Sequence, residues 1–532
     1  MEELKNKRIL IVCQEGLSFP FYYLANKWKK DNTIAAFFYG PAECSYNKCT
    51  FNENTYYKFK EMEDIIIYDS KEITNEYTEI FKSKDIIDNE YLDYIDNTYT
   101  HFSSLNEQII SSQLFSRHYH WRRYYEYVSQ IQQINWLILN YKNIEKIIKD
   151  FNPDFIFDDS NAELARTVLA EVCWNKKIPY ISNEYTRYKS FQIPTFSLAK
   201  MDEDYFVNAY KDNLNSSELS NYISYVENFR KQNKIMTEEN LRFFANKNSI
   251  FHSLKIIRGY LLYYFREDIL AGNYKRKKKN PILFPKSSEL IKYFIRIEFA
   301  RAVLTKKNKF FSNPDEKDEY VYMPLHLIPE STTFTKSPMY VNELSIIEAV
   351  SKSLPIRWKL YVKEHHAMLG ERPASFYNAV NRLPNVKMVQ INYYDDPKQW
   401  IVKSKGVITI SGTSAYEAVM LNKPAIVFSN VSFDVIKGIY HLKSFENLKK
   451  VFLEFNQPFD NLKECAAYIK TVEQFGENFD LTYLFEQGER IFRGMDTLDS
   501  EYEKQLSIME NFYLKGMKIS KQLENYKLDV KE

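Results

Sequence analysis

Glycine is unusually scarce in this sequence. It accounts for only 12 of the 532 residues, whereas an average protein contains about 7% glycine. Neither G-x-G-x-x-G nor G-x-x-x-x-G-K-[ST] occurs. These two patterns surround phosphates with backbone N–H groups in dinucleotide-binding folds and P-loop enzymes. Both of these glycine-rich phosphate cradles are therefore excluded.

Cysteines and long apolar runs are also few. The five cysteines are odd in number and mostly isolated, which is typical of reduced thiols and not of a disulfide framework. No uncharged apolar run approaches the roughly 18 residues of a transmembrane helix. The apolar-rich stretch Arg8–Cys13 is too short for the core of a signal peptide. We expect a cytoplasmic protein without a membrane span, and the absence of paired C-x-x-C or H-E-x-x-H patterns predicts no bound metal.

Charge of one sign is not in excess over the whole chain, which has 72 Lys+Arg against 70 Asp+Glu. This balance excludes nucleic acid as the expected main partner. Residues 251–310 are the exception, with fifteen Lys or Arg and four acids around the run Lys275–Lys279. Basic residues beside aromatic helices suit an anionic bilayer surface, so peripheral contact with the inner face of the cell membrane is one interpretation. A solvated loop between helices is the other.

Two regions have the alternating strand and helix pattern of an α/β fold. The first begins with a predicted strand at Arg8–Cys13, a helix at Phe21–Lys30 and a strand at Thr33–Tyr39, and the pattern returns at Asp154–Phe157. Residues 50–150 are mostly helical in pattern. The second region, 320–430, has the clearest rhythm, with predicted strands at Tyr320–Pro324, Lys359–Lys363, Val386–Ile391, Gly406–Ile410 and Ala425–Phe428.

The intervals between these strands fit right-handed crossovers in a parallel sheet. The sequence therefore predicts an α/β protein with two Rossmann-like domains facing a cleft, a helical insertion and C-terminal helices. The expected parts are an N-terminal acceptor-side domain (1–195), a basic helical insertion (196–318), a C-terminal nucleotide-sugar-binding domain (319–450) and a helical region that packs back on the first domain (451–532).

One candidate binding segment follows the predicted strand at 406–410. Its residues Ser411, Gly412, Thr413 and Ser414 form a turn of small residues before a helix that carries Glu417. Glycine permits close approach of a ligand, and the free N–H groups of a helix start suit a phosphate. Glu417 could accept hydrogen bonds from ribose or sugar hydroxyls. Equally, one of the hydroxyl side chains could cap the helix, with Glu417 as the capping acid.

The second candidate segment ends the strand at 359–363. Lys363 is followed by Glu364, His365 and His366. Because ligands of open α/β sheets bind beyond the carboxyl ends of the strands, Lys363 and His365 are predicted to face the same crevice as the first segment. A lysine can neutralise phosphate oxygens, and a histidine can protonate or orient a leaving group. An exposed strand end is the alternative interpretation.

Acidic residues follow a strand of the first region. Asp158 and Asp159 come directly after it, and Glu163 lies in the next helix. Adjacent carboxylates in a cleft raise each other's pKa, so that one can act as acid or base. Asp159 or Ser160 could instead simply cap the helix. Glu15 and Glu184 are weaker candidates for the same role.

Several of these segments resemble the capsule polysaccharide biosynthesis family. They are Tyr361–His365, Leu383–Val386, Ser411–Ala418 and Asn422–Phe428. That family includes retaining β-Kdo transferases, and the chain also resembles GT-B glycosyltransferases more broadly. The resemblance covers residues 320–435 well and the first region by layout only. His366 stands where such families usually have proline after the histidine.

The resemblance implies a glycosyltransferase that moves a sugar from a nucleotide donor, CMP- or NDP-linked, to a growing capsular or other surface polysaccharide. Lys363, Ser411, Gly412, Thr413, Ser414 and Glu417 would bind the donor, and Asp158, Asp159 and His365 would be catalytic. The acceptor would be lipid-linked or an oligosaccharide, and no cofactor would be tightly bound. The alternatives are a nucleotide-sugar epimerase, a teichoic-type polyol-phosphate transferase, and a non-catalytic glycan-assembly scaffold.

Overall fold

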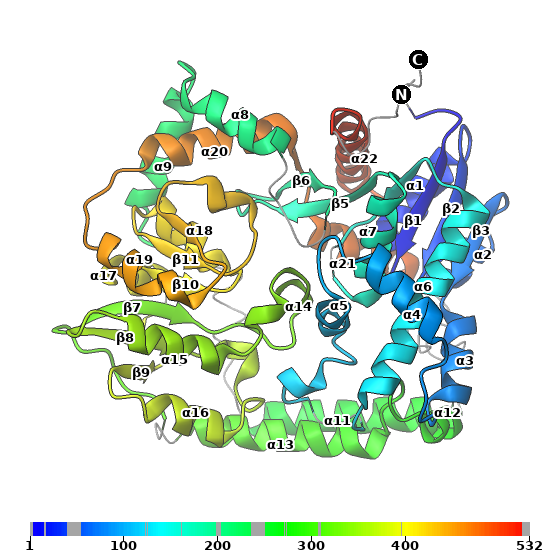
Figure 1. The fold of residues 1–532 in the computed structure, drawn as a ribbon, viewed down its shortest axis with the longest axis horizontal. Coiled ribbons are helices and arrows are strands. Elements are labelled where there is room, and N and C mark those ends of the chain that lie inside the picture. Colours follow the sequence, from blue (N-terminus) through cyan, green and yellow to red (C-terminus); the bar gives the residue numbers. More distant parts are fainter. Residues whose placement is uncertain are drawn as a thin grey trace.

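The computed structural model describes residues 4–14, 18–39, 55–122, 124, 126–160, 162–197, 204–235, 250–270, 272, 274–306, 310–394 and 396–523. Two separate sheets form the centres of two lobes, with helices packed around each sheet (Figure 1). The fold class expected from the sequence is confirmed, because each lobe is an α/β domain built on a largely parallel sheet. No helix in the described part of the chain is long and apolar enough to cross a bilayer.

The N-terminal sheet has seven strands in the order β13-β6-β5-β4-β1-β2-β3. All pairings from β5 to β3 are parallel, and β6 runs antiparallel to β5. The elements up to β6 are β1 (Arg8–Cys13), α1 (Phe19–Trp28), β2 (Thr33–Phe38), α2 (Thr55–Lys60), β3 (Ile65–Asp69), α3 (Lys71–Ile80), α4 (Asn89–Thr98), α5 (Leu105–Ser111), α6 (Gln130–Phe151), β4 (Phe155–Phe157), α7 (Leu164–Asn175), β5 (Tyr180–Tyr185) and β6 (Phe191–Thr195).

Strand β1 shows why this sheet is covered on both faces. Leu10 and Val12 enter one apolar core, and Ile9 and Ile11 enter another on the opposite side. Successive side chains of a strand point to opposite faces, so a run without polar residues requires helices on both sides.

The C-terminal sheet has six strands in the order β12-β11-β10-β7-β8-β9, and all of its pairings are parallel. Its domain contains β7 (Glu319–Pro324), α14 (Ser331–Lys336), α15 (Glu343–Ser353), β8 (Trp358–Lys363), α16 (Ala374–Asn381), β9 (Val386–Val389), α17 (Pro397–Lys403), β10 (Val407–Thr409), α18 (Thr413–Met420), β11 (Ala425–Val427), β12 (Ile439–His441) and α19 (Leu448–Glu454). The carboxyl ends of β8 and β10 therefore lie on either side of the end of β7.

Helices connect the two domains. The segment between the sheets contains α8 (Asp204–Leu214), α9 (Ser220–Lys231), α11 (Ile250–Phe265), the short helix η4 (Arg266–Leu270), α12 (Tyr274–Lys279) and α13 (Ser287–Lys306). Helices α11 and α13 pack against each other and run along the lower edge of the view in Figure 1, beneath both lobes.

The end of the chain returns to the first domain. Helix α20 (Leu462–Phe475) packs on α8 and α9, and β13 (Glu477–Asn478) then pairs with β6. Helix α21 (Leu481–Phe492) packs on α1, and α22 (Ser500–Ser520) packs on β5, β6 and α1. The N-terminal sheet and its core therefore include residues from the last part of the chain.

Candidate functional site

The turn after β10 leads directly into α18. Gly412 is the N-cap residue of this helix, and no side chain caps it. Thr413 is exposed, and Ser414 and Glu417 are partly buried. The interpretation in which a serine or threonine caps the helix is therefore not realised. The unused N–H groups of the first turn retain the positive end of the helix dipole, which favours an anion.

Packing within the protein requires glycine at position 412. A Cβ atom at this position would lie 2.4 Å from Thr409 Oγ1 and 3.4 Å from His326 Nε2. The backbone N–H of Gly412 donates to Thr409 Oγ1 over 3.0 Å. The absence of a side chain lets the turn settle onto the end of β10, which fixes the direction in which α18 begins.

A buried polar network lies beneath this turn. Arg372, with 2% of its surface exposed, forms ion pairs with both Glu343 and Glu364. Glu364 also accepts from the hydroxyl of Tyr377 at 2.7 Å, and Glu343 lies 3.2 Å from Nδ1 of His326. Burial alone would raise the pKa of Glu343, but the charge of Arg372 and the hydrogen bonds from His326 together lower that pKa. The network joins β8 to the ends of β7 and β10.

His326 connects this network to the turn. Its Nε2 atom lies 2.9 Å from Thr409 Oγ1, the atom that accepts from Gly412. In the neutral ring, Nδ1 donates to Glu343 and Nε2 accepts from the threonine hydroxyl. The turn that precedes α18 is thus held by a continuous chain of hydrogen bonds and ion pairs from the interior of the domain.

Lys363 and Glu417 are brought together at the carboxyl edge of the sheet. Both are partly buried, and the charge of each shifts the pKa of the other. Burial lowers the pKa of Lys363 to about 8 and raises that of Glu417 to about 7. Neither side chain has an ion-pair or hydrogen-bond partner within the described chain. Two opposite charges are therefore withdrawn from water without being paired directly.

His365 lies at the end of β8 with a defined orientation. Its Nδ1 atom accepts from the N–H of Ala367 at 3.2 Å, which leaves the ring proton on Nε2. Burial, reinforced by Arg372, lowers the pKa of His365 to about 4. The imidazole is consequently neutral at pH 7. It can donate a hydrogen bond from Nε2.

Arg187, in the hairpin between β5 and β6, contributes to this edge from the N-terminal domain. Its backbone has φ 66°, a left-handed conformation that is costly for a residue with a side chain. Its Nε atom is buried without a hydrogen-bond partner. Its charge opposes the rise in the pKa of Glu417. A strained arginine therefore extends from one domain toward the unpaired charges of the other.

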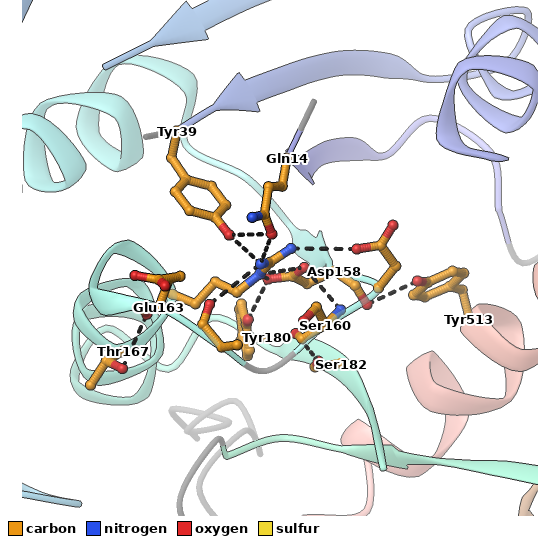
Figure 2. A network of polar contacts seen from close by, with 12 residues as sticks. Gln14, Tyr39, Asp158, Ser160, Glu163, Thr167, Tyr180, Ser182 and Tyr513 are labelled. Carbon is orange, nitrogen blue, oxygen red and sulfur yellow. Dashed lines mark hydrogen bonds and ion pairs between the residues drawn. The ribbon is translucent and has the colours of Figure 1, made fainter. Parts of the chain in front are cut away.

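The acidic loop after β4 contains a structural ion pair (Figure 2). Both carboxylate oxygens of Asp158 lie 2.9 Å from Arg166 Nε, and the hydroxyl of Tyr180 donates to Asp158 at 2.5 Å. The guanidinium of Arg166 also donates to Gln14 at 2.9 Å and contacts the hydroxyl of Tyr39. Asp158 and Arg166 are fully buried, so Asp158 acts in the structure as the nearer counter-ion of Arg166, whose Nη2 atom also lies 3.4 Å from Asp159 Oδ1.

Asp159 and Glu163 are the acids of this loop with raised pKa values. Burial raises the pKa of Asp159, against the charge of Arg166 and with a smaller contribution from Asp158. Its Oδ2 atom is buried without a hydrogen-bond partner. Burial also raises the pKa of Glu163 to about 7, and its backbone lies at φ 85°, ψ 153°. That region is almost exclusive to glycine, and such strain concentrates at functional sites.

Side-chain contacts also join the two domains. Glu184 on β5 forms an ion pair with Lys336 of α14, and these side chains are only 4% and 6% exposed. The hydroxyl of Tyr468 donates to the carbonyl of Thr186 at 2.7 Å. In Figure 1, α14 lies between the two lobes beside α5. Glu184 is therefore occupied in an interdomain ion pair, and Glu15 lies outside the described residues.

Several residues of the site are not apparent from the sequence. His326, Glu343 and Arg372 belong to no recognisable motif, and they meet only because β7, β8 and the helices around them converge. Arg187 gives no signal either, because its left-handed backbone is visible only in the structure. Among the described residues, no group of three or more His, Cys, Asp or Glu side chains is arranged to hold a metal ion.

No family model and no curated protein sequence matches the chain. Among solved structures, it is similar to KpsC, a beta Kdo 2,7 transferase from Thermosulfurimonas dismutans, at 9% identity and a TM-score of 0.28, over 66% of this chain and 89% of that one. It is also similar to UDP-GlcNAc 2-epimerases. For the enzyme from Methanocaldococcus jannaschii in complex with UDP-GlcNAc and UDP, the identity is 13% and the TM-score 0.26, over 88% of this chain and 99% of that one. For the enzyme from Neisseria meningitidis bound to UDP-GlcNAc, the identity is 11% and the TM-score 0.25, over 95% of this chain and 99% of that one. Because these identities and TM-scores are low, the fold class is taken from the two α/β domains described above and not from these similarities.

Proposed function

We propose that the protein is a glycosyltransferase that moves a sugar from a nucleotide-activated donor to a capsular or other surface polysaccharide. The observation that carries the proposal is the pair Lys363 and Glu417, partly buried without direct partners beside the uncapped start of α18. Burying a charge without a partner is costly, and a ligand that carries both phosphates and hydroxyls would satisfy both charges.

In this proposal the donor phosphates bind Lys363, Arg187 and the N–H groups at the start of α18, including those of Thr413 and Ser414. These groups supply positive charge where the leaving group becomes more negative during transfer. His365 donates from Nε2 to the same phosphates. Glu417 accepts from hydroxyls of the ribose or of the sugar. The buried Arg372 network keeps the turn in place while the donor enters.

Glu163 is the proposed general base or nucleophile of the acceptor side, with Asp159 as its neighbour. A pKa of about 7 allows Glu163 to take and return a proton near neutral pH. Asp158 supports this loop through Arg166. It is therefore proposed as a positioning residue, and Asp158→Asn would test folding as much as chemistry because Arg166 would lose its nearer counter-ion.

The first experiment is a thermal-shift titration with UDP, CMP and GDP. A nucleotide present at 100 times its Kd should stabilise the fold by about 2.7 kcal/mol. We expect at least one nucleotide to stabilise the native protein, and we expect Lys363→Met to weaken the affinity for that nucleotide at least tenfold. Lys352→Met, at an exposed lysine of α15, is the matched control. If no nucleotide stabilises the native protein, the proposed donor site is refuted.

The second experiment separates transfer from the alternatives. With a nucleotide-sugar donor and an oligosaccharide acceptor, the native protein should release nucleotide, and Glu163→Gln should reduce release while still binding the donor. Glu90→Gln, at an exposed residue of α4, should leave it unchanged. Conversion of the donor sugar without acceptor would indicate an epimerase, and binding without turnover would indicate a scaffold. Either result would overturn the transferase proposal.

A further inference from the structure

The solvent-facing side of α11 is apolar. Leu254, Leu261, Leu262 and Phe265 are 56%, 47%, 58% and 53% exposed. Their spacing of seven, eight and eleven residues from the first places them on one stripe of the helix. A helix of a water-soluble domain normally turns such a stripe toward the core, whereas here it faces outward.

The stripe continues onto the neighbouring elements. Ile269 and Leu270 of η4 are 64% and 67% exposed, and Tyr274 of α12 is 54% exposed. Ile295 and Phe299, one turn apart on α13, are 44% and 73% exposed. These nine side chains on α11, η4, α12 and α13 are called the hairpin face below. Exposed apolar patches of this extent mark interaction surfaces.

The opposite side of the same helices is fixed to the rest of the protein. The ring of Tyr260 stacks on Phe294 with centroids 3.8 Å apart, which joins α11 to α13. Tyr293 donates to Glu371 at 2.8 Å, and Gly370 lies so close that an added Cβ would be 2.6 Å from the carbonyl of Ile297. The hairpin face is therefore the outer side of a docked pair of helices.

Basic side chains surround the apolar ones. Lys255, Arg258, Arg266, Lys275 and Lys278 are exposed on α11, η4 and α12. Over residues 251–310 the chain carries fifteen Lys or Arg and four acids. Long basic side chains can lie along an apolar surface while their charges reach toward headgroups.

We propose that the hairpin face binds the surface of an anionic bilayer, with α11 lying in the plane of the membrane. Apolar side chains ringed by basic ones are what such an interfacial helix requires. A second copy of the chain would bring two basic surfaces together, and the centre of the face is too apolar for nucleic acid. The proposal does not depend on the donor site and can fail independently of it.

The test is co-sedimentation with vesicles of phosphatidylglycerol and phosphatidylethanolamine, compared with vesicles of phosphatidylcholine alone. The double variant Leu262→Asp/Phe299→Asp removes apolar contacts at two exposed positions, so its fold should be unaffected. Ile356→Asp is the matched control, because Ile356 lies in the C-terminal domain, outside the hairpin face, and is 98% exposed. The triple variant Arg258→Gln/Lys275→Gln/Lys278→Gln tests the charges.

We expect the native protein and the Ile356 variant to bind the anionic vesicles and not the neutral ones. The Leu262/Phe299 variant should bind at least tenfold more weakly at any salt concentration. The triple variant should lose up to about 100-fold in affinity for the anionic vesicles at low salt, since each charge near an anionic surface contributes about fivefold. The loss of affinity should be smaller at high salt because of screening.

Three results would overturn the proposal. The first is no sedimentation of the native protein with anionic vesicles. The second is equal loss of binding in the Ile356 control. The third is a native dimer in solution that the Leu262/Phe299 variant converts to a monomer, because the hairpin face would then be an interface between copies. Nucleotide binding measured in solution should be the same in all variants, which separates this test from that of the donor site.

Discussion

Replacing Glu417 by glutamine should stabilise the protein near neutral pH and weaken donor binding at the same time. Burial raises the pKa of this carboxyl from its ordinary value of 4.5 to about 7. At about 1.4 kcal/mol per pKa unit, the full difference corresponds to about 3 kcal/mol. Because the side chain is only partly buried, solvent reduces this value, and we expect a gain of about 1–2 kcal/mol.

The pH dependence of the effect follows from linkage. Below about pH 4.5 the folded and unfolded states both hold the proton, so the variant gains nothing over the native protein. Between pH 4.5 and about 7 only the folded state holds it, and the free energy of unfolding of the native protein therefore falls as pH rises. The advantage of Glu417→Gln should grow across this window and become constant above pH 7.

Urea denaturation at half-unit steps from pH 4.5 to 8 measures the difference, and nucleotide titration at pH 7.5 measures binding. Glu348→Gln, at an exposed residue of α15, is the control and should show no such pH dependence. A difference between Glu417→Gln and the native protein that is the same at every pH would refute the buried, protonated carboxyl. Unchanged nucleotide affinity in the variant would remove Glu417 from the donor site.

Three further predictions concern stability and turnover. Gly412→Ala should lower the free energy of unfolding by about 1–3 kcal/mol in urea denaturation, because its Cβ would meet Thr409. The control Gly259→Ala, with no atom within 4 Å of the new Cβ, should stabilise α11 by about 0.5–1 kcal/mol. An unchanged free energy of unfolding in the Gly412 variant would contradict the close packing. Arg372→Met should cost about 3–5 kcal/mol by leaving two buried glutamates unpaired, and an unchanged denaturation midpoint would argue against the network. Glu163→Gly should relieve about 1 kcal/mol of backbone strain and abolish nucleotide release, and retained release would exclude its catalytic role.

The main elements of the C-terminal domain could be predicted because local residues determine them. The strands at 320–324 and 407–409 are apolar runs between turn residues, and such runs form buried parallel strands wherever helices separate them. Strands β6 and β13 were not predicted. They are short, and their antiparallel pairing joins Gln192 to Glu477, which no local pattern records. The helical pattern expected for residues 50–150 likewise missed β3.

The candidate site, too, could be predicted from the sequence only in part. Lys363 and Glu417 could be placed near each other because the carboxyl ends of parallel strands share one edge of the sheet. The roles of Asp158 and Asp159 could not be distinguished, since both carboxylates pair with the buried Arg166, Asp158 at 2.9 Å and Asp159 at 3.4 Å. Which of the two acids lies nearer the guanidinium depends on the whole fold, which brings Arg166 to this loop.

The return of the chain end to the first domain has a consequence for synthesis on the ribosome. The hydroxyl of Tyr513 donates to the backbone carbonyl of Asp158 at 2.9 Å, and its ring stacks on Phe157. These partners lie 355 residues apart. The strands of the C-terminal sheet all precede β13 and α22 in the sequence, so the C-terminal domain can fold first, whereas the acidic loop is packed only after α22 has been translated. A chain terminated before α22 would thus lack the packing that shapes the acidic loop, and only molecules that include α22 would carry both halves of the proposed site.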